Sequence, residues 1–320
     1  MDRRTFNLSL AGSLLLPALP AFAATDYPSK NARIICPFAP GGSGDISSRL
    51  FAEHFKSATG QTLVVENRAG ASGGIGAAAV KNTAPDGYTL MLSTQSILIA
   101  NELFYKTLPY DPRDFTTVGL LGATCMFMLV NPSAPYNTVG EFIAYAKASP
   151  EKPTAAYYNT SSRIGAAIFA SRAGIQFNEI PYKDVGQAAV DLIAGRLSVT
   201  FLDTVAAAQH VQSNSLKPLA ATSGKRLDIY PDVPALSETF PDSEVLAFLS
   251  VSVPKEVPRD IQEKLNGLVN GTITDPAILP RFKPLGLILK QLDLAGVDAF
   301  VAEERKRWTE YVAIAKIEKE

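Results

Sequence analysis

Short apolar runs alternate with helical patterns along most of the chain. Residues 33–38 form one such run, and residues 46–55 carry apolar side chains at the three- and four-residue spacing of a helix that Gly60 ends. The same order of strand, loop and helix returns at residues 62–82, and again from a strand expected at residues 127–131. Strand–loop–helix units at this spacing predict parallel strands with right-handed crossovers, and therefore the α/β class.

The first 23 residues have the pattern of an export signal rather than of a folded segment. The pattern consists of two arginines at positions 3 and 4, apolar residues at 8–19, and Ala-Phe-Ala, a small-x-small cleavage site, at 21–23. The stretch falls short of the about 20 apolar residues that a spanning helix needs. We therefore expect export to the periplasm, by either the twin-arginine or the Sec route.

Charge and composition argue against several classes of function. The 320 residues include 30 lysines and arginines and 31 aspartates and glutamates, which gives no electrostatic attraction to nucleic acid or an anionic membrane. The histidines are His54 and His210, and the cysteines are Cys36 and Cys125. Metal sites and histidine-dependent catalysis therefore have few residues to draw on. Both cysteines lie in apolar, strand-like runs, so we favour free buried thiols and leave a disulfide open.

Four loops rich in glycine, serine or threonine follow predicted strands, at residues 41–45, 71–76, 93–96 and 159–163. The glycine spacings match neither a GxGxxG dinucleotide site nor a GK[ST] phosphate loop, which disfavours nucleotide binding. The glycine-rich loops place backbone amides directly before predicted helices, where unpaired N–H groups and the helix dipole favour an anion. One such loop indicates only a tight turn, but four at the carboxyl ends of strands predict a shared ligand cleft.

Several sequence blocks, in order over nearly the whole mature chain, resemble those of a known family. The blocks are Tyr27-Pro28 and residues 37–43 (PFAPGGS), 65–71 (VENRAGA), 85–90 (PDGYTL), 181–183 (PYK), 219–223 (LAATS) and 231–234 (PDVP). They are similar to the Bug/TctC-like extracytoplasmic solute receptors, the binding proteins of tripartite tricarboxylate transporters. The resemblance implies a two-lobed periplasmic binding protein, type II-like, in which each lobe is a mostly parallel sheet flanked by helices and two strand crossovers form the hinge.

The resemblance also implies the domain boundaries and the function. Residues 1–23 would be the signal peptide, residues 24–124 and 246–320 the first lobe, and residues 125–245 the second. Family members bind small carboxylates without cofactor, metal or catalysis. We expect a monomeric receptor that captures a di- or tricarboxylate or an aromatic acid and delivers it to integral membrane transporter subunits. An amino acid or amide-type ligand is the alternative.

Carried over position by position, the ligand-binding residues come from both lobes and act largely through backbone amides. They are Pro40, Gly41, Gly42, Ser43, Ser72, Gly73, Ser93 and Thr94 in the first lobe, and Asn159, Thr160, Ser161, Ser162 and Asp203 in the second. We expect the amides of Gly41, Gly42 and Ser43 to surround a ligand carboxylate. A side chain at Gly42 would then block close approach or a required positive φ.

The second-lobe loop departs from the family pattern, which commonly reads Tyr-Gly-Ser-x-Gly-x-Gly-Ser. Here Asn159, Ser162 and Ile164 stand at glycine positions, and Arg163 stands at a small residue. Two interpretations of Arg163 stay open. It is either a clamp that holds a second ligand carboxylate in a bidentate fork, or a solvated residue in the first turn of a helix, which we favour.

A secreted hydrolase or lyase is the competing interpretation, because two carboxylates lie near the predicted cleft. Asp45 is placed to cap the helix that follows it, which we favour. Asp203 also precedes a helix, and capping competes there with ligand contact or with the general base of an enzyme. Tyr157, Tyr158 and Tyr182 adjoin the cleft loops, either as an aromatic wall or as core residues. We expect a receptor and not an enzyme.

Overall fold

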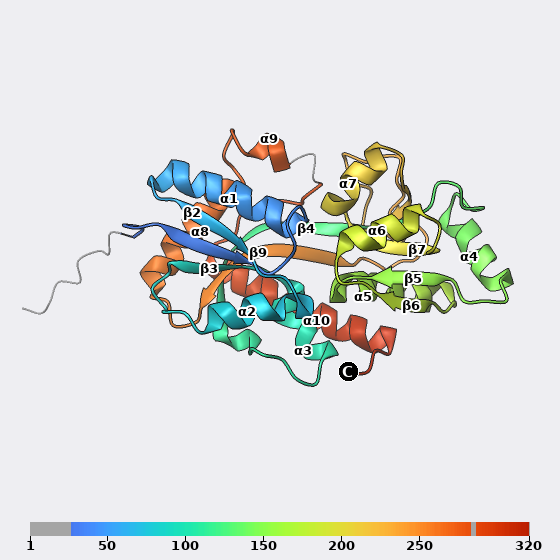
Figure 1. Cartoon of the computed structure of the whole chain (residues 1–320), viewed down its shortest axis with the longest axis horizontal. Helices are drawn as coiled ribbons and strands as arrows, with labels where there is room; N and C mark the ends of the chain where they lie inside the picture. Colours follow the sequence, from blue (N-terminus) through green and yellow to red (C-terminus); the bar gives the residue numbers. More distant parts are fainter. Residues whose placement is uncertain (1–26, 283–285, 320) are drawn as a thin grey trace, which may run out of the picture.

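Two lobes lie side by side along the longest axis of the molecule, as the computed structural model of residues 27–282 and 286–319 shows (Figure 1). The predicted signal peptide, residues 1–23, lies outside the described residues. Within them, no helix combines the length and the apolar character that crossing a membrane requires.

The first lobe is a five-stranded mixed sheet with helices on both faces. Its main elements are β1 (Ala32–Cys36), β2 (Leu63–Asn67), β3 (Thr89–Thr94), β4 (Phe115–Val130), β9 (Leu246–Pro254), α1 (Ser43–Thr59), α2 (Gly74–Lys81), α8 (Arg259–Thr272) and α10 (Leu294–Ala315). β1 pairs in parallel with β2 and β3, whereas β9 pairs antiparallel with β3 and with the first part of β4. Phe51 of α1 and Leu265 of α8 belong to the core on one face, and Val80 of α2 and Trp308 of α10 to the core on the other.

The second lobe repeats this arrangement around the far end of β4. Its main elements are β5 (Thr154–Tyr157), β6 (Asn178–Pro181), β7 (Val199–Asp203), β8 (Lys217–Ala221), α4 (Val139–Ala148), α5 (Thr160–Ala173), α6 (Val185–Ile193) and α7 (Thr204–Gln212). β5 pairs in parallel with β6 and β7, and β4 pairs antiparallel with β7 and β8. Phe142 and Phe169 lie in the core on one face, and Leu192 and Ala207 in the core on the other.

The α/β class and the two-lobed fold predicted from the sequence are confirmed. Gly60 ends α1 in the left-handed conformation, with φ of 75°, as a C-terminal glycine does. Parallel pairing holds within the strand–helix–strand units, but β4, β8 and β9 pair antiparallel, so the sheets are mixed rather than mostly parallel. Shorter elements complete the chain: η1 (Ala71–Gly73), the π-helical turn η2 (Ser96–Ala100), α3 (Asn101–Phe104), η3 (Pro112–Asp114), η4 (Leu236–Glu238) and α9 (Leu279–Phe282).

One strand, β4, runs through both lobes, where we expected a separate strand at residues 127–131. It is 16 residues long, and its partner changes along its length from β9 to β7 and β8. Its pairing with β9 is irregular next to Gly119 and Gly122, and such bulges increase the twist of a strand. Hydrophobic periodicity did not reveal this continuity. Nearly all of β4 is buried, so its sequence is a continuous apolar run without the alternation that would distinguish one long strand from two short ones.

Thr222 joins the two chain segments that cross between the lobes. Its hydroxyl accepts from the Met126 N–H at 2.9 Å and donates to the Val245 carbonyl at 2.7 Å. Its backbone N–H donates to the Met126 carbonyl, and its carbonyl accepts from the Val245 N–H. Met126 lies on β4 and Val245 precedes β9, so one buried side chain holds both crossovers together.

The C-terminal helix provides a further contact between the lobes. Ile164 and Ile168 of α5 belong to the same apolar core as Trp308 of α10. The Tyr311 hydroxyl donates to the Glu244 carbonyl at 2.7 Å, next to the second crossover. Figure 1 shows α10 passing from the first lobe toward α5. On this side the lobes are therefore joined by apolar packing and not only by strands.

The hydroxyl of Thr222 should contribute strongly to stability. Valine keeps the shape of the side chain but leaves the buried Met126 N–H and Val245 C=O without this partner, and each unsatisfied group costs about 1–3 kcal/mol. We expect Thr222→Val to lower the free energy of unfolding in urea by about 2–4 kcal/mol. Thr272→Val is the matched control. Thr272 is equally buried, but its hydroxyl only adds a bond to the Leu268 carbonyl of its own helix. Equal losses for the two variants would contradict the role assigned to Thr222.

Candidate functional site

The loops that carry the predicted site residues meet where the two lobes face each other. β1 and β2 lead into α1 and α2, and β5 and β7 lead into α5 and α7. Because β1 pairs in parallel with β2, and β5 with β7, each pair of loops lies at one edge of its sheet. Direct hydrogen bonds join these edges. The Thr160 hydroxyl donates to Ser96 at 2.7 Å, and the Gln95 amide donates to the Ser161 hydroxyl.

Asp45 organises the loop before α1 from the third residue of the helix. One carboxylate oxygen accepts from the Gly41 N–H at 3.0 Å, and the other accepts from Asn67 at 3.0 Å. Arg49, one turn along the helix, donates to both oxygens. Burial raises the pKa of Asp45, but these hydrogen bonds outweigh burial and hold the pKa below its usual range. The capping interpretation of Asp45 is wrong, because the amide that Asp45 bonds, that of Gly41, lies before the first residue of the helix, and α1 has no side-chain cap.

Two details of this loop differ from the expectation. The Gly41 amide is occupied by Asp45, so it is not available for a ligand. The backbone φ is +85° at Gly41 and −80° at Gly42, so the left-handed conformation belongs to Gly41. Pro40 and Gly41 are exposed, whereas Gly42 and Ser43 are half-buried. Helix α1 begins after Gly42 without a side-chain cap, which leaves its first N–H groups without a partner inside the helix.

The loop before α2 holds a run of left-handed residues. The φ angles are 127° at Gly70, 48° at Ala71, 50° at Ser72 and 89° at Gly73. For a non-glycine residue this conformation costs about 1–2 kcal/mol, and such strain clusters at functional sites. Gly73 is the N-cap of α2 and, lacking a side chain, supplies no cap. Helix α2 therefore also begins without a side-chain cap, although the Gly74 and Ile75 N–H groups bond to the carbonyls of Ala71 and Gly70 in the loop.

Ser93 and Thr94 at the end of β3 differ in what their hydroxyls do. Ser93 is fully buried, and its hydroxyl lies 2.7 Å from that of Ser250 and 2.6 Å from that of Ser252, inside the sheet. The structure thus places Ser93 in the sheet and not on a cleft wall, because alternate residues of a strand point to opposite faces. Thr94 is 5% exposed, and its hydroxyl has no partner among the described residues.

Thr94 lies beside the start of α1. Leu92 is two residues earlier on the same face of β3, and its side chain would touch a Cβ placed at Gly44, at 2.6 Å. Two residues of strand advance the chain by about 6–7 Å toward its carboxyl end. The unpartnered hydroxyl of Thr94 is therefore near the uncapped N-terminus of α1.

Gln95 and Ser96 connect the lobes, although sequence reasoning did not select either. The Gln95 amide donates to the Ser161 hydroxyl, and its oxygen accepts from the Phe248 N–H at 2.8 Å. Thr160 and Ser161, predicted to bind ligand, are 2% and 0% exposed and bond to this pair. The only sequence signal was the polar run at residues 93–96, which does not reveal its partners.

The helices of the second lobe, unlike α1 and α2 of the first, begin with side-chain caps. Asn159 accepts from the Ser162 N–H at 2.8 Å, and Ser162 accepts from the Asn159 N–H at 3.2 Å, a reciprocal capping box at the start of α5. Polar residues at these former glycine positions thus have a structural role. The N-terminal amides of α5 are partly occupied.

Asp203 both caps α7 and faces the first lobe. One of its oxygens accepts from the Ala206 N–H and the other from the Tyr158 hydroxyl, both at 3.0 Å, and the Ser43 side chain of the first lobe is near enough to lower its pKa. Burial raises the pKa of Asp203 above its usual range. Capping of α7 by Asp203 is confirmed, and its contact with a ligand stays a prediction.

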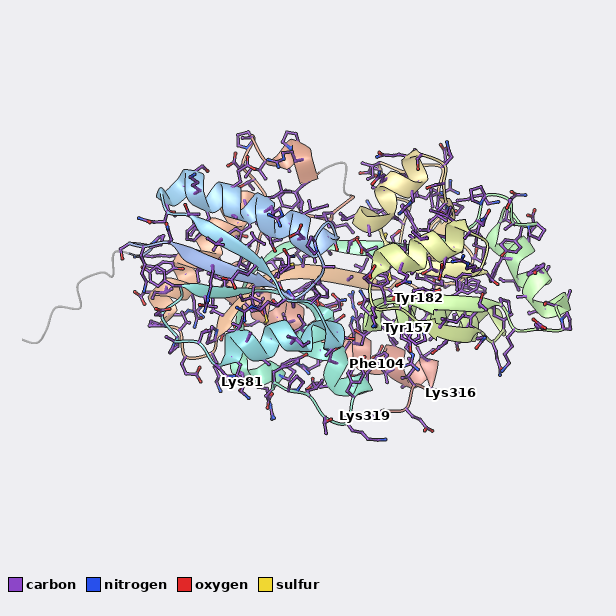
Figure 2. All side chains as sticks on the ribbon, in the orientation of Figure 1. Lys81, Phe104, Tyr157, Tyr182, Lys316 and Lys319 are labelled. Carbon is purple, nitrogen blue, oxygen red and sulfur yellow. The ribbon has the colours of Figure 1, made fainter. Side chains whose placement is uncertain are left out.

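Arg163 is neither solvated nor free. Its side chain is 18% exposed and donates to Glu179 at 2.9 Å. The guanidinium lies 5.1 Å from the ring centre of Tyr157 in its own lobe and 5.9 Å from that of Phe104 in the first lobe. Figure 2 labels these two rings where the lobes meet. The favoured solvated interpretation is wrong, because Glu179 on β6 supplies the anionic partner that the sequence did not reveal. The hydroxyl of Tyr182, one of the three tyrosines next to the predicted cleft loops, donates to the Asp191 carboxylate at 2.7 Å.

The site is thus asymmetric in its chemistry. The first lobe presents two helix N-termini without side-chain caps, and the second presents a buried carboxylate and capped helices. Arg49 and Arg163 are paired with Asp45 and Glu179. Among the described residues, no cluster of three histidine, cysteine or acidic side chains is placed to hold a metal ion. Cys36 and Cys125 are free and buried. An anion in this site would be held by amides and hydroxyls.

Comparisons with known proteins agree with this arrangement. Residues 47–317 match the family model of the tripartite tricarboxylate transporter family receptors, TctC. Protein BugT from Bordetella pertussis is 32% identical over 291 residues, 89% of each chain. R. palustris Rpa4515 with adipate superposes with a TM-score of 0.88 at 27% identity, over 92% of this chain and 100% of that one. MatC from Rhodopseudomonas palustris with bound malate gives 0.82 at 25% identity, over 89% and 100%. The chain therefore belongs to the TctC family, whose members are solute-binding receptors and not enzymes.

Proposed function

We propose that the protein is a periplasmic receptor that captures a small carboxylate between its lobes and delivers it to the membrane subunits of a tripartite transporter. The observation that carries the proposal is the pair of uncapped helices, α1 and α2, which begin at the same edge of the first lobe. Unpaired N–H groups and the positive end of a helix dipole attract a carboxylate. The ligand class is supported by relatives, since Rpa4515 holds adipate and MatC holds malate.

In this proposal the carboxylate lies against the start of α1. The amides of Ser43 and Gly44 point along the helix axis toward it, as the first N–H groups of any helix do. The unpartnered hydroxyl of Thr94 supplies a further donor from the end of β3. The strained loop at residues 70–73 brings the start of α2 to the same place. The carboxylate then needs no buried cation.

Binding would involve closure of the two lobes. The Thr160–Ser96 and Gln95–Ser161 hydrogen bonds cross the boundary between them, and an open form would break both. The hinge would be the two crossovers held by Thr222. TctC receptors are periplasmic, and the export signal predicted at residues 1–23 fits that location. A monomeric receptor and export by either route are parts of the proposal.

One observation favours a second candidate ligand class. Asp203 places a carboxylate on the wall opposite the helix N-termini, at 7% exposure. A second ligand carboxylate beside it would meet a like charge, which is costly in a buried site. A ligand with a carboxylate at one end and an ammonium or amide at the other would instead donate to Asp203. An amino acid or amide-type ligand is therefore the alternative to a dicarboxylate.

Calorimetry with a panel of small acids separates these classes. The panel contains adipate and malate as dicarboxylates, and glutamate and asparagine as ligands that carry an amino group. We expect at least one member to bind and to raise the melting temperature, with no product formed, because binding to the native state alone stabilises it. Product formation from esters or amides of these acids would contradict a receptor. Failure of the whole panel to bind would contradict the proposed ligand class.

A substitution at Gly42 tests whether the ligand lies next to this residue. A Cβ at Gly42 would find its nearest neighbour, the Ala39 carbonyl, at 3.8 Å, and φ of −80° suits any residue. We expect Gly42→Val to change the free energy of unfolding by less than about 0.5 kcal/mol. It should weaken binding of the best panel acid at least tenfold, because the side chain fills the ligand's space.

Gly41→Ala is the companion variant. Because φ at position 41 is +85°, an alanine there should lower the free energy of unfolding by about 1–2 kcal/mol. A stable Gly42→Val protein with wild-type affinity would place the ligand elsewhere.

A further inference from the structure

Asn101 is a fully buried polar residue that the predicted site did not include. It begins α3, directly after the π-helical turn η2. Its exposed fraction is 0%, and its side-chain oxygen has no partner among the described residues. Burying an amide oxygen without a hydrogen-bond partner is costly. The hydrogen bonds that the side-chain nitrogen of Asn101 donates offset part of this cost.

The Asn101 amide nitrogen bridges the first lobe's core and the strained loop. It donates to the Ser72 carbonyl at 3.0 Å and to the Tyr110 hydroxyl at 3.0 Å. Tyr110 in turn donates to the Ile97 carbonyl at 2.9 Å, within η2. Burial raises the pKa of Tyr110 to about 12, so the phenol stays protonated and keeps this donor. The hydrogen bond to Tyr110 thereby holds the Asn101 side chain against η2, and its second hydrogen bond reaches the Ser72 carbonyl.

Two neighbours of Asn101 support the same loop. The Tyr105 and Ser72 hydroxyls lie 3.1 Å apart. A Cβ at Gly73 would come within 2.8 Å of Ile97, so the loop rests closely on η2. Ala71 and Ser72 have the left-handed backbone that non-glycine residues disfavour, and surrounding contacts must maintain it. The segment at residues 96–105 provides those contacts.

We infer that Asn101 is a positioning residue of the binding site, which holds residues 70–73 in the left-handed conformation that they have beside the proposed carboxylate position. The inference rests on the proposed function, since it takes this loop to be part of the carboxylate site. Asn101 itself does not touch the ligand. It acts through the Ser72 carbonyl, and its loss would let the loop relax to right-handed φ values and turn the amides away.

The same segment also bonds the second lobe. Gln95 and Ser96, at the start of η2, contact Ser161 and Thr160, and Asn101 follows directly after η2. Loop 70–73 and the interlobe hydrogen bonds therefore rest on one short element. The geometry of the loop and the contact between the lobes are coupled through it.

The test compares variants that loosen the loop with one that does not. Asn101→Ala removes both donors, and Tyr105→Phe removes only the hydroxyl that faces Ser72. Asn266→Ala is the matched control. Asn266 also bridges two carbonyls of the first lobe, those of Val118 and Leu292 at 2.8 and 2.9 Å, and neither lies in the loop. The probe is adipate, or malate if the wild type binds malate more tightly.

Two readouts are measured on every variant: hydrogen exchange of the amides at residues 70–75 without ligand, and affinity for the probe by calorimetry. We expect Asn101→Ala to speed exchange in this loop and to weaken the probe at least tenfold. Tyr105→Phe should change both in the same direction but less. Asn266→Ala should lose stability without changing loop exchange or affinity.

Tyr105→Phe keeps the test decisive if Asn101→Ala does not fold, because it removes a single oxygen. Unchanged loop exchange in the folded variants would overturn the inference. Faster exchange with wild-type affinity would overturn it too, since the loop would then be held by Asn101 but not used for binding. A wild type that binds neither acid contradicts the proposed function instead, and loop exchange alone then decides whether Asn101 holds the loop.

Discussion

The geometry of the molecule depends on the hydrogen bonds of Thr222 at the junction of the lobes. A single buried hydroxyl satisfies the N–H of one crossover strand and the carbonyl that precedes the other. Backbone groups at a place where sheets separate have no regular ladder to pair with, and leaving them unpaired is expensive. In the observed arrangement, Thr222 provides hydrogen-bond partners for the backbone groups of Met126 and Val245 at this junction. Together with β4 and β9, that arrangement joins the two sheets at one place.

The facing edges divide the chemistry between them. The first lobe offers helix starts at glycines, and glycine leaves N–H groups open to a ligand because it has no side chain to cap them. The second lobe caps its helices with Asn159 and Asp203, which occupies some of their amides. Amide donors carry no net charge, so a site made of them can stand empty without an unpaired buried cation. Asp45 and Arg49 also leave no unpaired charge beside this loop, because the two side chains form an ion pair.

The side of the molecule that contains α10 is held differently. There Ile164, Ile168 and Trp308 share a core, so contact between the lobes is apolar and broad. Near the site, the described contact includes hydrogen bonds that join Gln95 and Ser96 to Thr160 and Ser161. Apolar packing tolerates little separation, whereas hydrogen bonds exchange readily with water. Relative motion of the lobes would therefore open the site while α10 and the crossovers stay in contact.

The sequence alone determined the α/β class, most helices and strands, and the loops of the proposed site, because periodicity, glycines and capping residues are local signals. Gly60 and Asp203 are examples, since each acts on the helix next to it. Tertiary structure decided the rest. Asp45 occupies the Gly41 amide, Ser93 turns into the sheet toward Ser250, Arg163 finds Glu179, and Asn101 reaches back to Ser72. Partners such as Ser93 and Ser250 lie 157 positions apart. No local pattern encodes such pairs, because only the packing of the sheet and the crossing of β4 and β9 bring them within hydrogen-bond distance.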